Sequence, residues 1–168
     1  AEYGAGFPAF VAASAPARAL PYLADIARLD WALNVAFHSP EGRRLAMADL
    51  AVIEPDRLPS LSIALPLGAA LIGSHYPIDR IWSASQPGAS AETVNLEGGR
   101  ADLLVLRRAD DAAFIVLGGG EAAFVAELAG GKSLEGAAEQ AASAEPSFDL
   151  STAFARLLSL EAFAALQQ

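Results

Sequence analysis

The residue types that most often carry out chemistry are few in this sequence, and they are not spaced as a catalytic or metal-binding set. The chain has no cysteine, which excludes disulfides, thiolate catalysis and cysteine-ligated zinc. His38 and His75 are its two histidines, whereas a catalytic metal usually has about three protein ligands. Neither histidine belongs to a ligand-spaced motif or accompanies a serine in a glycine-flanked elbow. We therefore expect no catalytic residue, no metal site and no cofactor.

A glycine-rich segment, GGGEAA at residues 118–123, fits a loose dinucleotide-binding pattern. It follows a predicted strand and opens a predicted helix, as phosphate binding at a helix N-terminus requires. The pattern also needs a second strand that ends in an acidic residue about 20 residues further on. That region, around Glu139, has helical periodicity instead. The sequence favours a tight strand-to-helix turn and leaves nucleotide binding as the weaker alternative.

Amphipathic aromatic residues are better candidates for a binding role. Tyr22 and Trp31 fall on a predicted long helix, whereas Arg80 and Trp82 fall on a short helical segment at 77–83 that Tyr76 directly precedes. Tyrosine, tryptophan and arginine are enriched among the residues that dominate binding energy at protein interfaces. The alternative is that these residues anchor the boundary of the core. As a binding set, they would supply packing anchors and one positive charge for a carboxylate.

Charge argues against a nucleic-acid partner. The net charge of the 168-residue chain is −9, with 11 basic residues, and an acidic protein repels phosphate backbones. Its adjacent arginine pairs, at 43–44 and 107–108, are interpreted as solvated surface residues.

Two further observations concern localisation. The chain does not open with a charged-then-apolar signal sequence, and we expect a cytoplasmic protein. Residues 58–78 lack Asp, Glu, Lys and Arg, but Pro66 and Gly68 interrupt this stretch near its middle. We predict buried strands joined by a turn there, and no membrane partner.

Hydrophobic periodicity predicts an α+β fold, with a small, mostly antiparallel sheet of about four strands packed with helices and preceded by an N-terminal helical segment. Strands are expected at 61–65, 67–72, 103–107 and 114–117. Helices are expected at 4–17, 21–38, 77–83, 121–129 and 133–143, from 149 to about 166, and as a short piece within 43–60. Ser133 and Asp149 are the expected N-caps of the last two helices. We assign residues 1–42 to a helical segment and 43–168 to an α+β domain.

Three segments carry a family resemblance that extends from about Phe7 to Leu166. They are LPYLADIARLDWA at 20–32, YPIDRIW at 76–82, and LLVLRR at 103–108 followed by a strand that ends in glycine. In this order they resemble the HvfC-type proteins, a family that has also been described as DNA-binding.

The resemblance implies a non-catalytic accessory subunit of a methanobactin- or bufferin-type peptide-modifying system. Such a subunit pairs with an iron-dependent enzyme of TIM-barrel type, and together they bind a ribosomally made precursor peptide whose cysteines the enzyme oxidises. The iron belongs to the enzyme. Recognition of the peptide by strand addition to a sheet edge agrees with the predicted strands. The alternative, which the family's other description implies, is a DNA-binding or transcription-linked regulatory protein.

The chain departs from the family pattern in two respects. Family members usually begin with a separate helical domain, of which residues 1–42 would be the last helices. They also tend to carry a His-Pro pair near the first strand, where this chain has Leu65 and Pro66. If that histidine matters, the partner or the peptide differs here.

Overall fold

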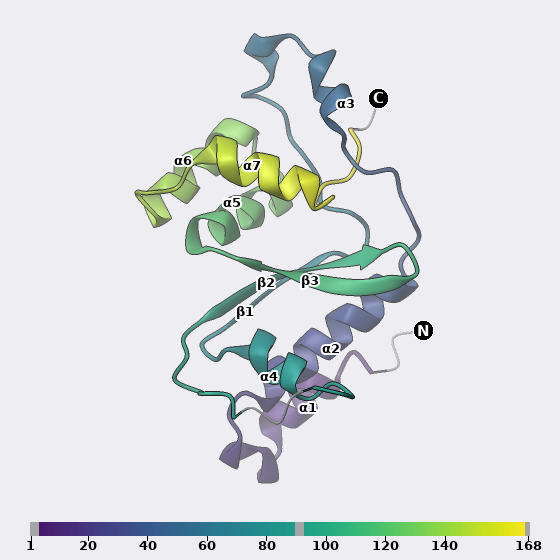
Figure 1. The fold of residues 1–168 in the computed structure, drawn as a ribbon, viewed down its shortest axis with the longest axis vertical. Coiled ribbons are helices and arrows are strands. Elements are labelled where there is room, and N and C mark those ends of the chain that lie inside the picture. The colour runs from purple at the N-terminus through teal and green to yellow at the C-terminus, as the bar shows by residue number, and fades with distance from the viewer. Residues whose placement is uncertain (1–3, 90–92, 167–168) are drawn as a thin grey trace.

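The chain forms an α+β structure in which a three-stranded antiparallel sheet lies between two sets of helices (Figure 1). The computed structural model describes residues 4–89 and 93–166. The strand order is β1-β2-β3, with β1 at Ala70–Ser74, β2 at Ala101–Arg108 and β3 at Asp111–Leu117. The predicted α+β class is therefore confirmed.

Seven α-helices fall within the described residues. They are α1 (Phe7–Ala13), α2 (Leu23–His38), α3 (Met47–Ala51), α4 (Ile78–Ala84), α5 (Gly119–Ala129), α6 (Leu134–Ala144) and α7 (Leu150–Ser159), with 3-10 turns η1 (Pro16–Ala19) and η2 (Pro55–Arg57). Both predicted N-caps are confirmed. The Ser133 hydroxyl accepts a hydrogen bond from the Gly136 N–H at 3.3 Å, and the Asp149 carboxylate accepts one from the Ser151 N–H at 2.8 Å.

The central strand β2 is covered on both faces. Residues 101–106 are all buried. Since successive side chains of a strand point to opposite faces, one row, which includes Leu103 and Val105, packs with Leu29 of α2. The other row, which includes Leu104, packs with Phe124 of α5. A strand covered on both faces has apolar residues on both, which explains the unbroken hydrophobic run at 103–106 of β2.

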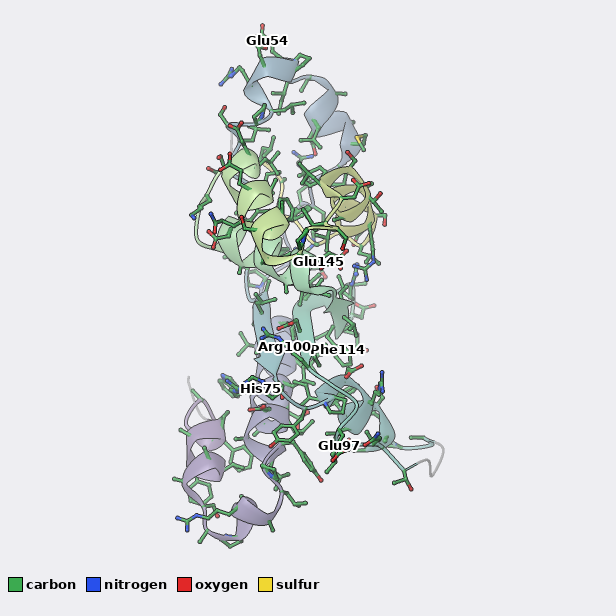
Figure 2. All side chains as sticks on the ribbon, turned by 90° about the vertical axis from the view of Figure 1, so that its left-hand side faces the viewer. Glu54, His75, Glu97, Arg100, Phe114 and Glu145 are labelled. Carbon is green, nitrogen blue, oxygen red and sulfur yellow. The ribbon has the colours of Figure 1, made fainter. Side chains whose placement is uncertain are left out.

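The two sets of helices come from opposite ends of the chain. In Figure 1, α1, α2 and α4 lie on one side of the sheet, and α5, α6 and α7 lie on the other. Figure 2 gives the view from the side, with Glu54 of the segment before η2 at one end of the molecule and Arg100 near the level of the sheet. The N-terminal helix α2 contacts all three strands and shares their core.

The expectation of a strand at 61–65 is wrong, and the described sheet has three strands instead of about four. This segment forms a single isolated bridge, between Ser62 and Ser133, and the Ala64 carbonyl accepts from the Ala164 N–H at 2.9 Å. Its backbone groups thus bond to the start of α6 and to the C-terminal tail. Apolar residues alternate in this segment because Ile63 is buried in the core, at 1% exposure, although the segment does not pair with the sheet.

No helix in the described part of the chain is both long enough and apolar enough to cross a membrane. The stretch without Asp, Glu, Lys or Arg at 58–78 contains a turn and β1.

Candidate functional site

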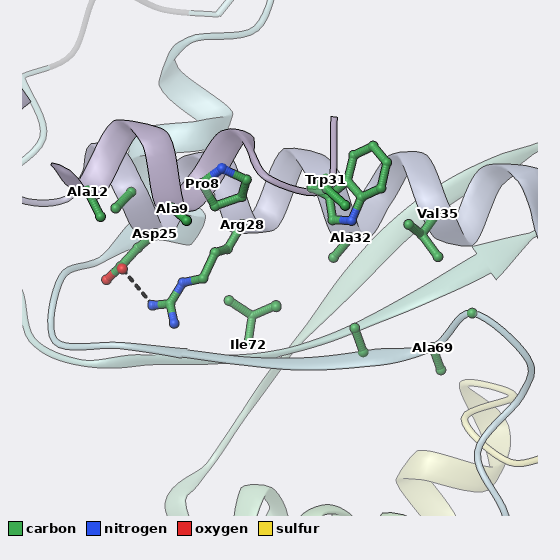
Figure 3. A pocket seen from close by; sticks show the side chains of 14 residues that line it. Pro8, Ala9, Ala12, Asp25, Arg28, Trp31, Ala32, Val35, Ala69 and Ile72 are labelled. Carbon is green, nitrogen blue, oxygen red and sulfur yellow. Dashed lines mark hydrogen bonds and ion pairs between the residues drawn. The ribbon is translucent and has the colours of Figure 1, made fainter. Parts of the chain in front are cut away.

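A groove of about 740 Å³ runs beside β1, between this strand and the helices α1 and α2. β1 is an edge strand, because β2 is its one neighbour in the described sheet. The strand and the turn before it line one side of the groove, and α1 lines the opposite side (Figure 3). The groove is therefore continuous with a sheet edge.

Small side chains make this surface concave. Alanines line the groove on every element around it: Ala9 and Ala12 on α1, Ala24 and Ala32 on α2, and Ala69 just before β1. Each of these side chains ends at its Cβ atom, so the helices and the strand leave space between them. The lining is predominantly apolar, which is typical of pockets that bind a ligand through shape and burial.

Trp31 and the tight turn at Gly68 also belong to the lining of the groove. Trp31 of α2 lines the groove, and the segment before α1 passes so close that a Cβ added at Gly4 would lie 2.7 Å from its ring. At Gly68 the backbone has φ +74°, and an added Cβ would lie 1.8 Å from the Ser39 hydroxyl oxygen. Glycine is thus required where the turn before β1 packs against the end of α2.

Asp25 and Arg28 are the charged residues among the groove's described lining. Arg28 Nη2 donates to Asp25 Oδ1 at 2.5 Å and to the Gly73 carbonyl oxygen at 3.4 Å. The Ser74 hydroxyl donates to Asp25 Oδ2 at 2.5 Å. Figure 3 shows the ion pair inside the groove. Two donors therefore hold Asp25, while the Arg28 side chain is 49% exposed and remains accessible from the groove.

Three of the five predicted binding residues lie on or near this edge of the sheet. Trp31 lines the groove itself. Tyr22 and Tyr76 contact each other edge to face, with ring centroids 6.2 Å apart. The Tyr76 N–H donates to the Ser74 hydroxyl at 3.0 Å, which places the tyrosine pair just beyond the end of β1.

The other two predicted residues lie elsewhere, on α4. Trp82 Nε1 donates to Asp30 at 2.7 Å, and its ring packs edge to face on Phe114 with a centroid distance of 5.5 Å. Arg80 is exposed and lines a separate groove of about 700 Å³, together with Phe114 of β3. The structure therefore divides the predicted set between the two edges of the sheet.

Sequence reasoning missed Asp25, Arg28 and Ser74. Asp25 and Arg28 are spaced i,i+3 on α2, with Trp31 a further three residues on, so all three fall on neighbouring positions of one helix face. That spacing is a signal that the sequence contained. The sequence could not indicate a role for Ser74, because 49 residues separate it from Asp25, to which it donates a hydrogen bond.

The glycine-rich segment makes the predicted tight strand-to-helix connection: Gly118 alone separates β3 from α5, and residues 119–123 form the start of α5. The Glu145 carboxylate accepts from the Gly120 N–H at 2.6 Å, and Glu121 accepts from the Gly118 N–H at 3.1 Å. Carboxylates of the protein itself thus occupy backbone donors that a phosphate would need.

The two arginine pairs meet in space, and their interpretation as solvated surface residues is wrong for Arg44 and Arg107. Arg107 is 20% exposed and donates to the Ser39 carbonyl at 3.0 Å. Arg44 donates to the Arg107 carbonyl at 3.1 Å, and burial lowers the pKa of the Arg44 guanidinium from its ordinary value. These arginines join the end of α2 and residue 44 to the β2–β3 hairpin.

The histidines lie apart. His38 Nδ1 is 2.9 Å from the Asn34 carbonyl oxygen, and His75 is exposed. Across residues 4–89 and 93–166, no group of three or more His, Asp or Glu residues is placed to hold a metal ion.

In comparisons with known proteins, the chain matches no family model, no curated protein and no solved structure. The family resemblance remains a prediction, and the groove beside β1 is the feature of the described residues on which a function can be based.

Proposed function

We propose that this protein is a non-catalytic recognition subunit of a peptide-modifying system. It binds an extended segment of a ribosomally made precursor peptide beside β1 and presents it to an iron-dependent enzyme of TIM-barrel type, in the cytoplasm. The iron belongs to the enzyme. The observation that carries the proposal is the continuity of an apolar groove with an unpaired sheet edge.

An edge strand offers main-chain donors and acceptors along its outer side, and an extended peptide can pair with them. Main-chain hydrogen bonds then supply affinity, while pockets for alternate side chains supply specificity. The alanine-lined groove provides such space beside residues 69–72. Trp31, at the groove wall, offers the large amphipathic surface that commonly anchors a bound peptide.

The test fills the groove without touching the core. Ala9 is exposed on α1 and lines the groove, whereas Ala13 is exposed on the same helix and does not belong to its lining. Ala9→Trp should abolish binding of a labelled precursor peptide, measured by fluorescence anisotropy. The matched control Ala13→Trp should bind like the unmodified protein.

Co-elution with an iron-dependent enzyme of TIM-barrel type in size-exclusion chromatography tests the second half of the proposal. We expect both tryptophan variants to retain the enzyme. Undiminished peptide binding by Ala9→Trp would show that the peptide binds elsewhere. If the unmodified protein bound neither the peptide nor the enzyme, the proposal would be wrong, and a gel shift at low salt would then test the DNA-binding alternative.

A further inference from the structure

Arg28 contacts the edge of β1 at the place where a peptide strand would pair. Its Nη2 atom lies 3.4 Å from the Gly73 carbonyl oxygen and 2.5 Å from Asp25 Oδ1. Charged side chains at a sheet edge discourage non-specific strand pairing. A peptide N–H that approached the Gly73 carbonyl would therefore compete with Arg28 for the same acceptor.

If Arg28 moves away from Gly73, the Asp25 carboxylate still accepts a hydrogen bond from another residue. Asp25 keeps the hydrogen bond from the Ser74 hydroxyl, at 2.5 Å, whatever Arg28 does. Ser74 is itself fixed, because it is buried and accepts from the Tyr76 N–H at 3.0 Å. Arg28 is thus the part of this network that can move, since its side chain is 49% exposed.

Once it has moved away from the Gly73 carbonyl, the Arg28 guanidinium can donate to another acceptor, because it has five N–H groups. Arginine binds a carboxylate through two parallel N–H groups, a geometry that lysine cannot reproduce. Arg28 is the cationic residue in the described lining of the groove, within a chain whose net charge is −9. An acidic peptide side chain would be repelled by most of this protein's surface and attracted at this position.

We infer that Arg28 is the specificity-determining residue of the groove and selects an extended peptide that carries an Asp or Glu side chain beside the end of β1. Binding of that carboxylate draws Arg28 away from the Gly73 carbonyl and opens the edge to main-chain pairing. The neighbouring peptide positions hold small or medium apolar side chains, because the lining of the groove apart from Asp25 and Arg28 is apolar. This inference rests on the proposed function, since it takes β1 as the edge that the peptide joins.

A random linear peptide library displayed on phage tests this directly. Peptides selected on the unmodified protein are first sorted by whether Ala9→Trp abolishes their binding, which identifies those that occupy the groove. We expect these groove-binding peptides to be enriched in Asp or Glu at one fixed position. Their affinity for Arg28→Ala should fall about tenfold, and added salt should weaken their binding to the unmodified protein.

Further variants separate charge from geometry. Arg28→Lys keeps a cation beside Asp25 and should recover part of the affinity, while Arg28→Glu should select basic peptides instead. Arg57→Ala, which removes an exposed arginine of η2 outside the groove lining, should change nothing.

The possible failures are distinguishable. Groove-binding peptides without acidic enrichment, or equal affinity for Arg28→Ala and the unmodified protein, would overturn the role of Arg28 and leave the peptide groove intact. If no selected peptide lost its binding to Ala9→Trp, the groove itself would not bind peptides, and the proposed function would fail together with this inference.

Discussion

Arg107 of β2 donates a hydrogen bond to the carbonyl oxygen of Ser39, at 3.0 Å, and so caps the C-terminal end of α2. The same guanidinium donates to the Phe37 carbonyl and pairs with Glu41 at 3.2 Å. The last carbonyls of a helix lack partners within the helix, and a cation is favourable beside them. One side chain of the central strand thereby fixes the helix that covers one face of the sheet.

Replacement of Arg107 by methionine should reduce the free energy of unfolding by about 1–2 kcal/mol, because the α2 carbonyls lose charged donors. The loss stays modest because Arg107 Nε is buried without a hydrogen-bond partner among the described residues, and methionine removes that buried polar atom. Urea denaturation measures the change. Arg108→Met is the matched control: its contact with Glu161 is an ion pair at 3.6 Å, and we expect a cost below about 0.5 kcal/mol. Equal losses for the two variants would contradict the capping role.

Gly119 and Gly120, the first two residues of α5, should change the stability of the protein in different ways when each is replaced by alanine. A Cβ added at Gly120 would lie 2.6 Å from the Phe148 ring, whereas one at Gly119 would meet Glu145 at an ordinary 3.6 Å. Gly120→Ala should therefore cost about 1–3 kcal/mol through overpacking. Gly119→Ala should be neutral or stabilise the protein by up to about 1 kcal/mol, because it restricts the unfolded chain. Thermal unfolding of both variants tests this, and a stabilising Gly120→Ala would contradict the packing seen here.

Trp82 needs a conservative substitution if its binding role is to be tested. Trp82→Ala removes the contact with Phe114 as well as the bond to Asp30, and we expect it to cost about 2–3 kcal/mol of stability. Trp82→Phe keeps a ring on Phe114 and loses the Nε1–Asp30 hydrogen bond of 2.7 Å. We expect this loss to cost about 0.5–1.5 kcal/mol of stability.

The sequence-based prediction is that loss of Trp82 weakens partner binding by more than about 1 kcal/mol. Enzyme binding by folded Trp82→Phe and Trp82→Ala, measured by calorimetry, decides between a hot spot and a packing residue. Unchanged affinity in both variants would assign Trp82 to packing alone.

Asp149 should make stability depend on pH in the acidic range. Hydrogen bonds from the N–H and hydroxyl groups of Thr152 lower the pKa of the Asp149 carboxyl below its ordinary value. A pKa that is lower in the folded state than in the unfolded state stabilises the fold above the unfolded pKa, and this stabilisation is lost as the pH falls through the folded pKa. Asp149→Asn should therefore unfold at a lower temperature than the unmodified protein at pH 7, and the difference should shrink below about pH 4.

The control for this pH series is Asp56→Asn. Asp56 is exposed in η2 and makes no side-chain hydrogen bond within the described residues. Its replacement should leave the pH profile unchanged. A constant difference between Asp149→Asn and the unmodified protein at every pH would contradict the capping account.

Local sequence signals predicted those parts of the fold that depend on neighbouring residues. The N-caps Ser133 and Asp149 and the helix at 21–38 were predicted correctly, because capping and helical periodicity act within a few residues. The last helix was predicted to continue to about residue 166, but α7 ends at Ser159. Phe163 is buried all the same, in the tail after α7, where its ring stacks on Phe154 at 5.3 Å.

The parts that could not be predicted depend on contacts between distant segments. The tail after α7 leaves helical geometry because its backbone bonds elsewhere: the Leu45 N–H donates to the Phe163 carbonyl at 3.1 Å. In the groove, Arg28 and Gly73 are 45 residues apart. Aromatic residues could be identified from their type alone, but the charged network beside β1 exists only once α2 packs on the sheet.

The two-sided burial of β2 also sets an order of events during synthesis. When the ribosome has completed β3 at Leu117, the chain already contains α2 and can cover the row that includes Leu103 and Val105. The row with Leu104 and Leu106 stays bare until the residues of α5 and α7 have emerged, because its partners Phe124 and Leu157 belong to those helices. While residues 118–159 are being synthesised, the nascent chain therefore carries a sheet with one uncovered apolar face, the kind of exposed hydrophobic surface to which chaperones bind.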